Sequence, residues 1–154
     1  MADMSLQTLT DRAAISDVVH AYASAIDRRD WAAFRSLFTD RVFIDMRSFD
    51  PTRYREVGAD ELLELAKPLG QFDATQHMSS NHVHRIDGDQ ANCTTYMQAG
   101  HFMKRADGDF SCFLYGYYTY DLTRSATGWK IRRYALNITG QQGDPRVFEW
   151  AGMR

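Results

Sequence analysis

The chain has 154 residues, of which 44% are hydrophobic, 13% aromatic and 25% charged. This composition is typical of one globular domain and excludes a disordered or low-complexity chain. The formal net charge of −2 at pH 7 provides no basic field for a polyanion, so nucleic acid is not an expected partner. The sequence shows no run of about 18 apolar residues and no signal-peptide pattern, so we expect a cytoplasmic protein without membrane contact.

The N-terminal part of the chain predicts two helices. Apolar residues recur at helical spacing over about 10–28, after a possible cap at Thr10 or Asp11. Asp30 can cap a short second helix that begins at Trp31. The pattern therefore predicts a helical hairpin.

The next segment alternates between several short elements. Residues 41–46 alternate weakly between apolar and polar residues and predict a strand. Residues 47–57 carry a proline and several charges and predict a loop. A third helix is expected over about 59–67, where Pro68 ends it.

From His77 onward the pattern changes to long β-rich runs separated by turn signals. Glycine-containing turns are expected at 87–89, 107–109 and 126–128. Strands over about 90–104 and 110–123 would be unusually long, and long strands that contain glycine tend to be bent. The sequence therefore predicts a curved antiparallel meander.

The run FSCFLYGYYTYD carries apolar or aromatic residues on both alternating faces. Such a strand is covered on both sides, and we expect the helices on one face and another subunit on the other. Helices followed by a strongly curved antiparallel sheet predict an α+β domain, in which the sheet wraps round the helices and leaves a pocket.

Three segments carry a resemblance to a known family. DRAAISDVVHAYASAIDRRDWAAFRSLFTD, TQHMSSNHVHRIDGD and GWKIRRYALNI resemble the SnoaL-like branch of the nuclear transport factor 2 superfamily. The resemblance implies one cone-shaped domain over 1–154, with its core at about 8–139 and a C-terminal tail at 140–154. The motif YxxxxDxxDWxxFxxLF marks membership and is formed here by Tyr22, Asp27, Asp30, Trp31, Phe34, Leu37 and Phe38.

The resemblance also implies a proton-abstracting dyad. In the lyases of this branch, an aspartate at the end of the first helix pairs with a histidine on a following strand, and these positions match Asp27 and His77. The dehydratases place a tyrosine five residues before the aspartate, which matches Tyr22. Scytalone dehydratase carries a second histidine about one strand later, for which His101 is the nearest candidate.

The related hexachlorocyclohexane dehydrochlorinase departs from this pattern. That enzyme has a lysine near the position of Tyr22 and an arginine on the last strand. The lysine is absent here, which argues against dehydrochlorination. The arginine corresponds to Arg133 or Arg132, because the alternation of the strand is ambiguous there.

The chemistry of these residue types fits the dyad and also fits plainer roles. A carboxylate bonded to an imidazole fixes the tautomer and stabilises the imidazolium, and a histidine of pKa about 6.5 is poised as a general base. Alternatively, Asp27 bonds backbone amides of the turn before Asp30, His77 is a structural residue and Tyr22 packs in the core.

Aromatic residues on the predicted elements are candidates for a pocket lining. Phe43, Tyr96 and Tyr118, together with His101, are the expected substrate-binding residues, and ordinary core packing is their alternative. A pocket lined in this way favours a hydrophobic ring compound with one or two polar groups.

No metal or other cofactor is expected. His82 and His84 share one strand face and, with Asp87 nearby, are similar to part of a cupin metal site. Further ligands at suitable spacing are missing, and a helical N-terminus does not fit that fold. Cys93 and Cys112 fall at distant points of paired strands, so we expect free thiols.

The leading functional prediction is a cofactor-independent lyase that performs a dehydratase-type elimination on a hydrophobic small molecule. An isomerase or a polyketide-type cyclase with the same dyad is the nearest alternative, and a non-catalytic ligand-binding or assembly protein is the next. Self-association is expected in each case, with a trimer favoured over a dimer because the lyases of this branch are often trimers.

Overall fold

The computed structural model describes residues 5–153. Helix α1 spans Leu6–Arg28 and begins four residues earlier than predicted. The reason is its cap: the Ser5 hydroxyl accepts a hydrogen bond from the backbone N–H of Thr8 at 3.2 Å, so neither Thr10 nor Asp11 starts the helix. None of the described helices is long and apolar enough to cross a membrane.

The second helix confirms the predicted hairpin. Helix α2 spans Trp31–Ser36, and Asp30 caps it by accepting the backbone N–H of Ala33 at 3.0 Å. Arg29 joins the two helices in the left-handed conformation with φ 60°. This geometry turns the chain sharply at the end of α1.

Helix α3 and two flanking segments complete the part of the chain before the meander. Helix α3 spans Ala59–Ala66, and the 3₁₀ helix η1 over Lys67–Gln71 follows it directly. The prediction of a loop over 47–57 is wrong at its end, because strand β2, Tyr54–Gly58, pairs antiparallel with β1, Phe38–Asp45.

The sheet has six strands in the order β2-β1-β6-β5-β4-β3. The predicted meander is confirmed by the strands β3 (Ala74–Asp87), β4 (Gln90–Arg105), β5 (Gly108–Ser125) and β6 (Gly128–Gly143). Strand β1 pairs with β6 in parallel, so the sheet is mixed at that one point and antiparallel elsewhere.

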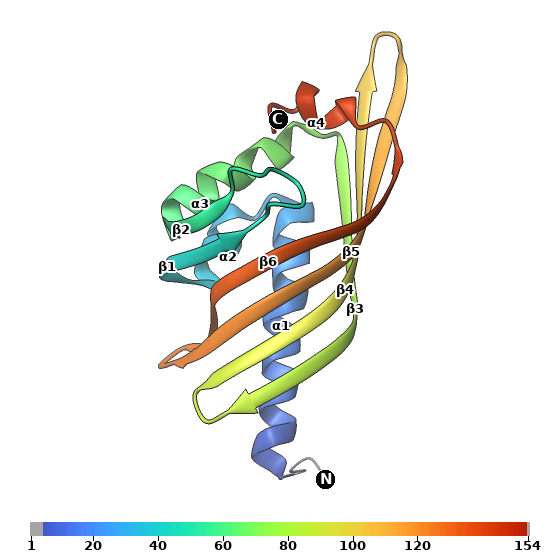
Figure 1. Ribbon diagram of the computed structural model, residues 1–154. Coiled ribbons are helices and arrows are strands. Elements are labelled where there is room, and N and C mark those ends of the chain that lie inside the picture. The colour runs from blue at the N-terminus through green and yellow to red at the C-terminus, as the bar shows by residue number, and fades with distance from the viewer. Residues whose placement is uncertain (1–4, 154) are drawn as a thin grey trace.

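The sheet bends strongly round α1, which lies along its concave side (Figure 1). A bulge between β5 and β6 falls at Gly116, where a side-chain Cβ would collide with the backbone of Asn137. Only glycine allows the two strands to approach there, and the bulge adds to the bend. The predicted α+β fold with a curved sheet is therefore confirmed.

A second bulge changes which residues of β3 face the helices. Before it, Thr75 and His77 point to the concave side; after it, His82 and His84 do so. The register shifts between positions 80 and 83, and Asn81 has a φ of 54°. One inserted residue thus brings odd-numbered and even-numbered histidines to the same face.

The C-terminal tail packs against the open end of the sheet. Helix α4 spans Arg146–Trp150 and packs against β4 and β5, in the upper part of Figure 1. Val147 and Phe148 are completely buried, so this helix is part of the core. The two cysteines are buried and are not bridged to each other, as predicted.

Candidate active site

Asp27 and His77 form a hydrogen-bonded pair between α1 and β3. The Nδ1 atom of His77 lies 2.7 Å from Oδ1 of Asp27, and the backbone N–H of His77 donates to Oδ2 at 2.8 Å. Because a carboxylate only accepts hydrogen bonds, Nδ1 carries a proton, and in the neutral ring Nε2 keeps its lone pair. The pair therefore has the arrangement of a general base and its orienting carboxylate.

Two further side chains hold the Asp27 carboxylate in place. Thr75 donates its hydroxyl to Oδ1 of Asp27 at 2.9 Å, and Arg29 donates to the Thr75 oxygen at 2.7 Å. Arg29 also donates to the backbone oxygens of Ile26 and Phe72. Sequence reasoning missed both residues; the left-handed conformation that turns the Arg29 side chain to this site has no signature in the sequence.

Opposing effects act on the pKa of Asp27. Burial of the carboxyl raises its pKa, but the hydrogen bonds from the ring and backbone of His77 and from Thr75 outweigh it, so the pKa lies below its ordinary value. The carboxylate is therefore ionised at neutral pH and can stabilise a protonated His77 ring. The alternative in which Asp27 bonds amides of the following turn does not hold, because its backbone partner is on β3.

His77 lines a cavity on the concave side of the sheet. The cavity is small, with a volume of about 50 Å³ open to water-sized molecules. Its polar groups come from His77, His101, Tyr22 and Tyr118. The rest of the lining is apolar and comprises Ile26, Met46, Phe49, Leu69, Met97, Ala99, Leu114, Leu136, Phe148 and Met153.

His101 is the second histidine of the cavity. It is 2% exposed, and its ring centroid lies 5.6 Å from that of His77. Burial lowers the pKa of His101 to about 3, and the nearby His77 acts in the same direction. Its Nδ1 lies 3.3 Å from the backbone oxygen of Cys112. His101 is therefore a neutral ring that can accept or donate a hydrogen bond.

Tyr22 and Tyr118 meet edge to face at the cavity, with ring centroids 5.6 Å apart. Burial raises the pKa of Tyr118 to about 12 and raises that of Tyr22 well above its ordinary value. Both phenols stay protonated at neutral pH. The two hydroxyls hydrogen-bond to each other, and they share the cavity with the His77 and His101 rings.

Three of the predicted site residues lie outside the cavity, which corrects the predictions for Arg133, Phe43 and Tyr96. Phe43 and Arg133 pair across β1 and β6 and stack on each other, with the guanidinium carbon 5.1 Å from the ring centroid. Tyr96 is 60% exposed and lies in a groove on the convex face. All three side chains alternate out of the concave face, whereas their neighbours Ile44, Met97 and Tyr134 point in.

Two segments outside the four strands of the meander complete the apolar lining of the cavity. Phe148 and Met153 belong to the C-terminal segment, and Met46 and Phe49 lie in the connection between β1 and β2. Both segments lie at the open end of the curved sheet, where they line the same cavity as His77.

Comparison with known proteins supports this fold. The family model described as "SnoaL-like domain" matches residues 7–135. The uncharacterised protein Rv2910c of Mycobacterium tuberculosis is 29% identical over 132 residues, which cover 84% of this chain and 86% of that protein.

Two solved structures show the same architecture. The Kfla4162 protein of Kribbella flavida superposes with a TM-score of 0.83 at 27% identity, covering 88% of this chain and 95% of that one. A protein of Novosphingobium aromaticivorans, provisionally named a scytalone dehydratase, gives a TM-score of 0.78 at 21% identity, with 89% of each chain covered. On the match to the family model, the chain belongs to the SnoaL-like family of the nuclear transport factor 2-like superfamily.

Proposed function

We propose that the protein is a lyase that carries out a dehydratase-type elimination on a hydrophobic small molecule. The observation that carries this proposal is the 2.7 Å contact between Asp27 and His77 beside an apolar cavity. The lyases that this chain resembles use such a dyad. A binding protein would have no need of a basic imidazole nitrogen at the cavity wall.

The first step of the proposed reaction is removal of a proton from carbon. The lone pair of His77 Nε2 takes a proton from the carbon adjacent to the one that bears the leaving group. The electron pair of that C–H bond forms the new double bond. Asp27 stabilises the imidazolium that results. The imidazolium then returns its proton to the departing oxygen, which leaves as water, so the enzyme ends in its starting state.

The tyrosines supply the second part of the proposed chemistry. Tyr22 and Tyr118 are protonated donors in a space from which the apolar lining excludes most water. Hydrogen bonds from such groups to a substrate carbonyl stabilise the negative charge that develops as the proton leaves. The arginine predicted for this role, Arg133, lies outside the cavity, so the phenols take its place in the proposal.

The lining also limits the substrate. The dyad is among the few polar groups of the cavity, and most of the remaining lining is formed by methionine, leucine and phenylalanine side chains. This division suits a ring compound with an activated C–H and a hydroxyl leaving group at one end. An isomerase or cyclase would use the same dyad, so the two classes differ in the product rather than in the site.

A product screen tests the proposal. Hydrophobic β-hydroxy carbonyl compounds are incubated with the enzyme and analysed by mass spectrometry, in which elimination appears as the loss of water and isomerisation leaves the mass unchanged. The variant His77→Gln should lower turnover by about 10²- to 10⁴-fold, the usual contribution of a general base, and circular dichroism should show an unchanged fold. Equal turnover in the variant contradicts the proposal.

We also propose that the protein self-associates through the convex face of the sheet, as a trimer. Met78, Tyr96 and Tyr117 are exposed there and line one groove. Contiguous apolar surface of this kind is typical of contacts between subunits. Light scattering in solution gives the mass that decides between monomer, dimer and trimer.

A further inference from the structure

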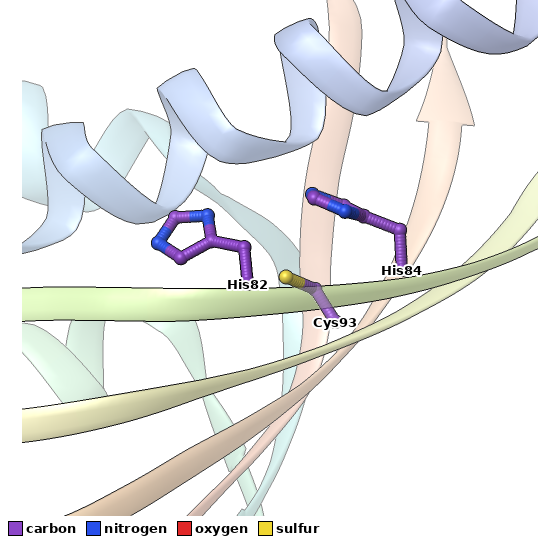
Figure 2. A group of neighbouring side chains, drawn as sticks. All are labelled: His82, His84 and Cys93. Atoms are coloured by element: carbon purple, nitrogen blue, oxygen red, sulfur yellow. The ribbon is translucent and has the colours of Figure 1, made fainter.

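A second cluster of chemically active side chains lies under α1, away from the cavity. His82 and His84 come from β3 and Cys93 from β4, and all three point toward the helix (Figure 2). None of the three lines the active-site cavity. His84 is seven residues beyond His77, which corresponds to roughly 20 Å along the strand.

The three side chains are close enough to share one ion. One nitrogen of each ring and the Cys93 Sγ all lie within 4.8 Å of one another. Zinc binds nitrogen at about 2.0–2.1 Å and sulfur at about 2.3 Å, which sets ligand atoms roughly 3.5 Å apart in a tetrahedron. The side chains therefore need to approach by about 1 Å, which small rotations of two half-buried rings provide.

The backbone supports this arrangement. His84 and Cys93 are direct partners in the β3–β4 register, so their side chains leave the sheet side by side. The bulge at Asn81 brings His82 to the same face. Two strands and one bulge thus fix the three donors, as rigid elements do in built metal sites.

Ser16 of α1 provides an oxygen at the same place. Its Oγ lies 2.9 Å from Nδ1 of His82 and 2.9 Å from Nε2 of His84. A single hydroxyl proton serves only one of these rings, so the other ring must donate to the oxygen. The remaining nitrogens, Nε2 of His82 and Nδ1 of His84, are buried, and neither has a hydrogen-bond partner among residues 5–153.

The charges at the cluster leave both rings ready to coordinate. Burial lowers the pKa of His82 and of His84, and for His84 the positive charge of Arg12 adds to the effect. Neutral imidazole is the form that binds metals. Burial raises the pKa of the Cys93 thiol to about 11, so an ion must displace its proton, and the thiolate that forms offsets the charge of Arg12.

We propose that His82, His84 and Cys93 form a metal site for a thiophilic ion, Zn²⁺ in the first place, with the Ser16 hydroxyl or a water as fourth ligand. Two imidazoles and one thiolate are a donor set typical of zinc and copper. On binding, the Cys93 S–H bond breaks, the sulfur binds the ion and one proton goes to solvent. With Ser16 as the fourth ligand the ion ties α1 to β3 and β4, and with either fourth ligand it takes no part in the proposed elimination.

Cobalt titration tests the site, because Co²⁺ reports on sulfur ligation by its colour. The whole chain, treated with a chelator and kept reduced, is titrated with Co²⁺ alone. We expect one equivalent to produce a thiolate-to-cobalt charge-transfer band and the strong visible bands of tetrahedral cobalt, and Zn²⁺ to remove both. The absence of these bands overturns the proposal.

The two cysteines offer a matched pair of variants. Cys93→Ser should abolish the charge-transfer band and weaken binding by at least about 100-fold, since even the loss of an outer-sphere partner costs about 10- to 100-fold in metal affinity. Cys112→Ser, at the other buried cysteine, should bind as the original chain does. A band that persists in Cys93→Ser, or that is lost in Cys112→Ser, contradicts the assignment.

Alkylation of the unchanged chain gives an answer that does not depend on the folding of a variant. Saturating Zn²⁺ should slow the labelling of Cys93 and leave that of Cys112 unchanged, as read by mass spectrometry of peptides. Equal labelling of Cys93 with and without Zn²⁺ counts against the site.

Discussion

The two ends of the concave face of β3 each carry histidines that contact α1, yet they are built differently. At one end the His77 ring is fixed by a carboxylate, which Thr75 and Arg29 hold in turn. At the other end His82 and His84 share one serine hydroxyl, and a nitrogen on each ring lacks a partner among the described residues. A carboxylate fixes one tautomer for proton transfer, whereas two neutral rings beside a thiol are suited to an ion.

The largest expected effect comes from removing the charge at the first end. Asp27→Asn keeps the shape of the side chain but no longer fixes the Nδ1–H tautomer or stabilises the imidazolium. Turnover should fall by about 10²- to 10⁴-fold. The exposed Asp17 on the same helix gives the control Asp17→Asn, which should be as active as the original enzyme. Full activity in Asp27→Asn would show that the pair is structural.

A smaller effect is the pH dependence of the free energy of unfolding, which arises from His101 beside the dyad. Its pKa is about 3 in the folded protein and about 6.5 in the unfolded chain. The unfolded state therefore binds a proton that the folded state refuses, so the stability is present above pH 6.5 and is lost as the pH falls toward 3. Between pH 7 and pH 5 the free energy of unfolding should decrease by about 2 kcal/mol through this residue.

Urea unfolding at the two pH values measures this change. His101→Phe keeps a ring between Phe72 and Phe148, whose centroids lie 5.0 and 4.8 Å from that of His101, and it should remove most of the difference. His20→Asn, at an exposed position on α1, should leave it in place. If His101→Phe shows the full pH dependence, the neutral His101 is not its source.

The smallest expected effect tests the support of the dyad. Arg29→Gly suits the left-handed backbone at φ 60° but removes the guanidinium that holds Thr75. We expect kcat to fall by about tenfold with little change in KM, since a misplaced catalytic group affects the chemical step more than binding. Arg29→Lys should restore part of the rate. An unchanged kcat in Arg29→Gly would limit Arg29 to a structural role.

The parts of the fold that repeat a clear period could be predicted from the sequence. The spacing of apolar residues in α1 and the turn signals of the meander are local patterns, and both were confirmed. Strand β2 was missed because YREVG is short and charged and shows no alternation. Its pairing with β1 depends on a long-range contact that the local pattern does not contain.

Within the site, the residues predicted correctly from the sequence were mainly those that match the family pattern. Asp27 and His77 lie together as the resemblance implies, but the faces of Phe43 and Tyr96 follow from strand parity, which their aromatic character does not reveal. The bulge at Asn81 hides the second cluster, because counting along an unbroken strand puts His77 and His84 on opposite faces. Cys93 joins the histidines only once the β3–β4 register is known.

The most direct test of the central claim is the protonation state of the His77 ring, measured by ¹⁵N nuclear magnetic resonance on the labelled protein at neutral pH. We expect a protonated Nδ1, hydrogen-bonded to Asp27, and an Nε2 with the shift of an unprotonated, basic nitrogen. The variant Asp27→Asn should lose this single tautomer. A proton on Nε2 in the unchanged protein would contradict the account, because the ring would then present no base to the cavity.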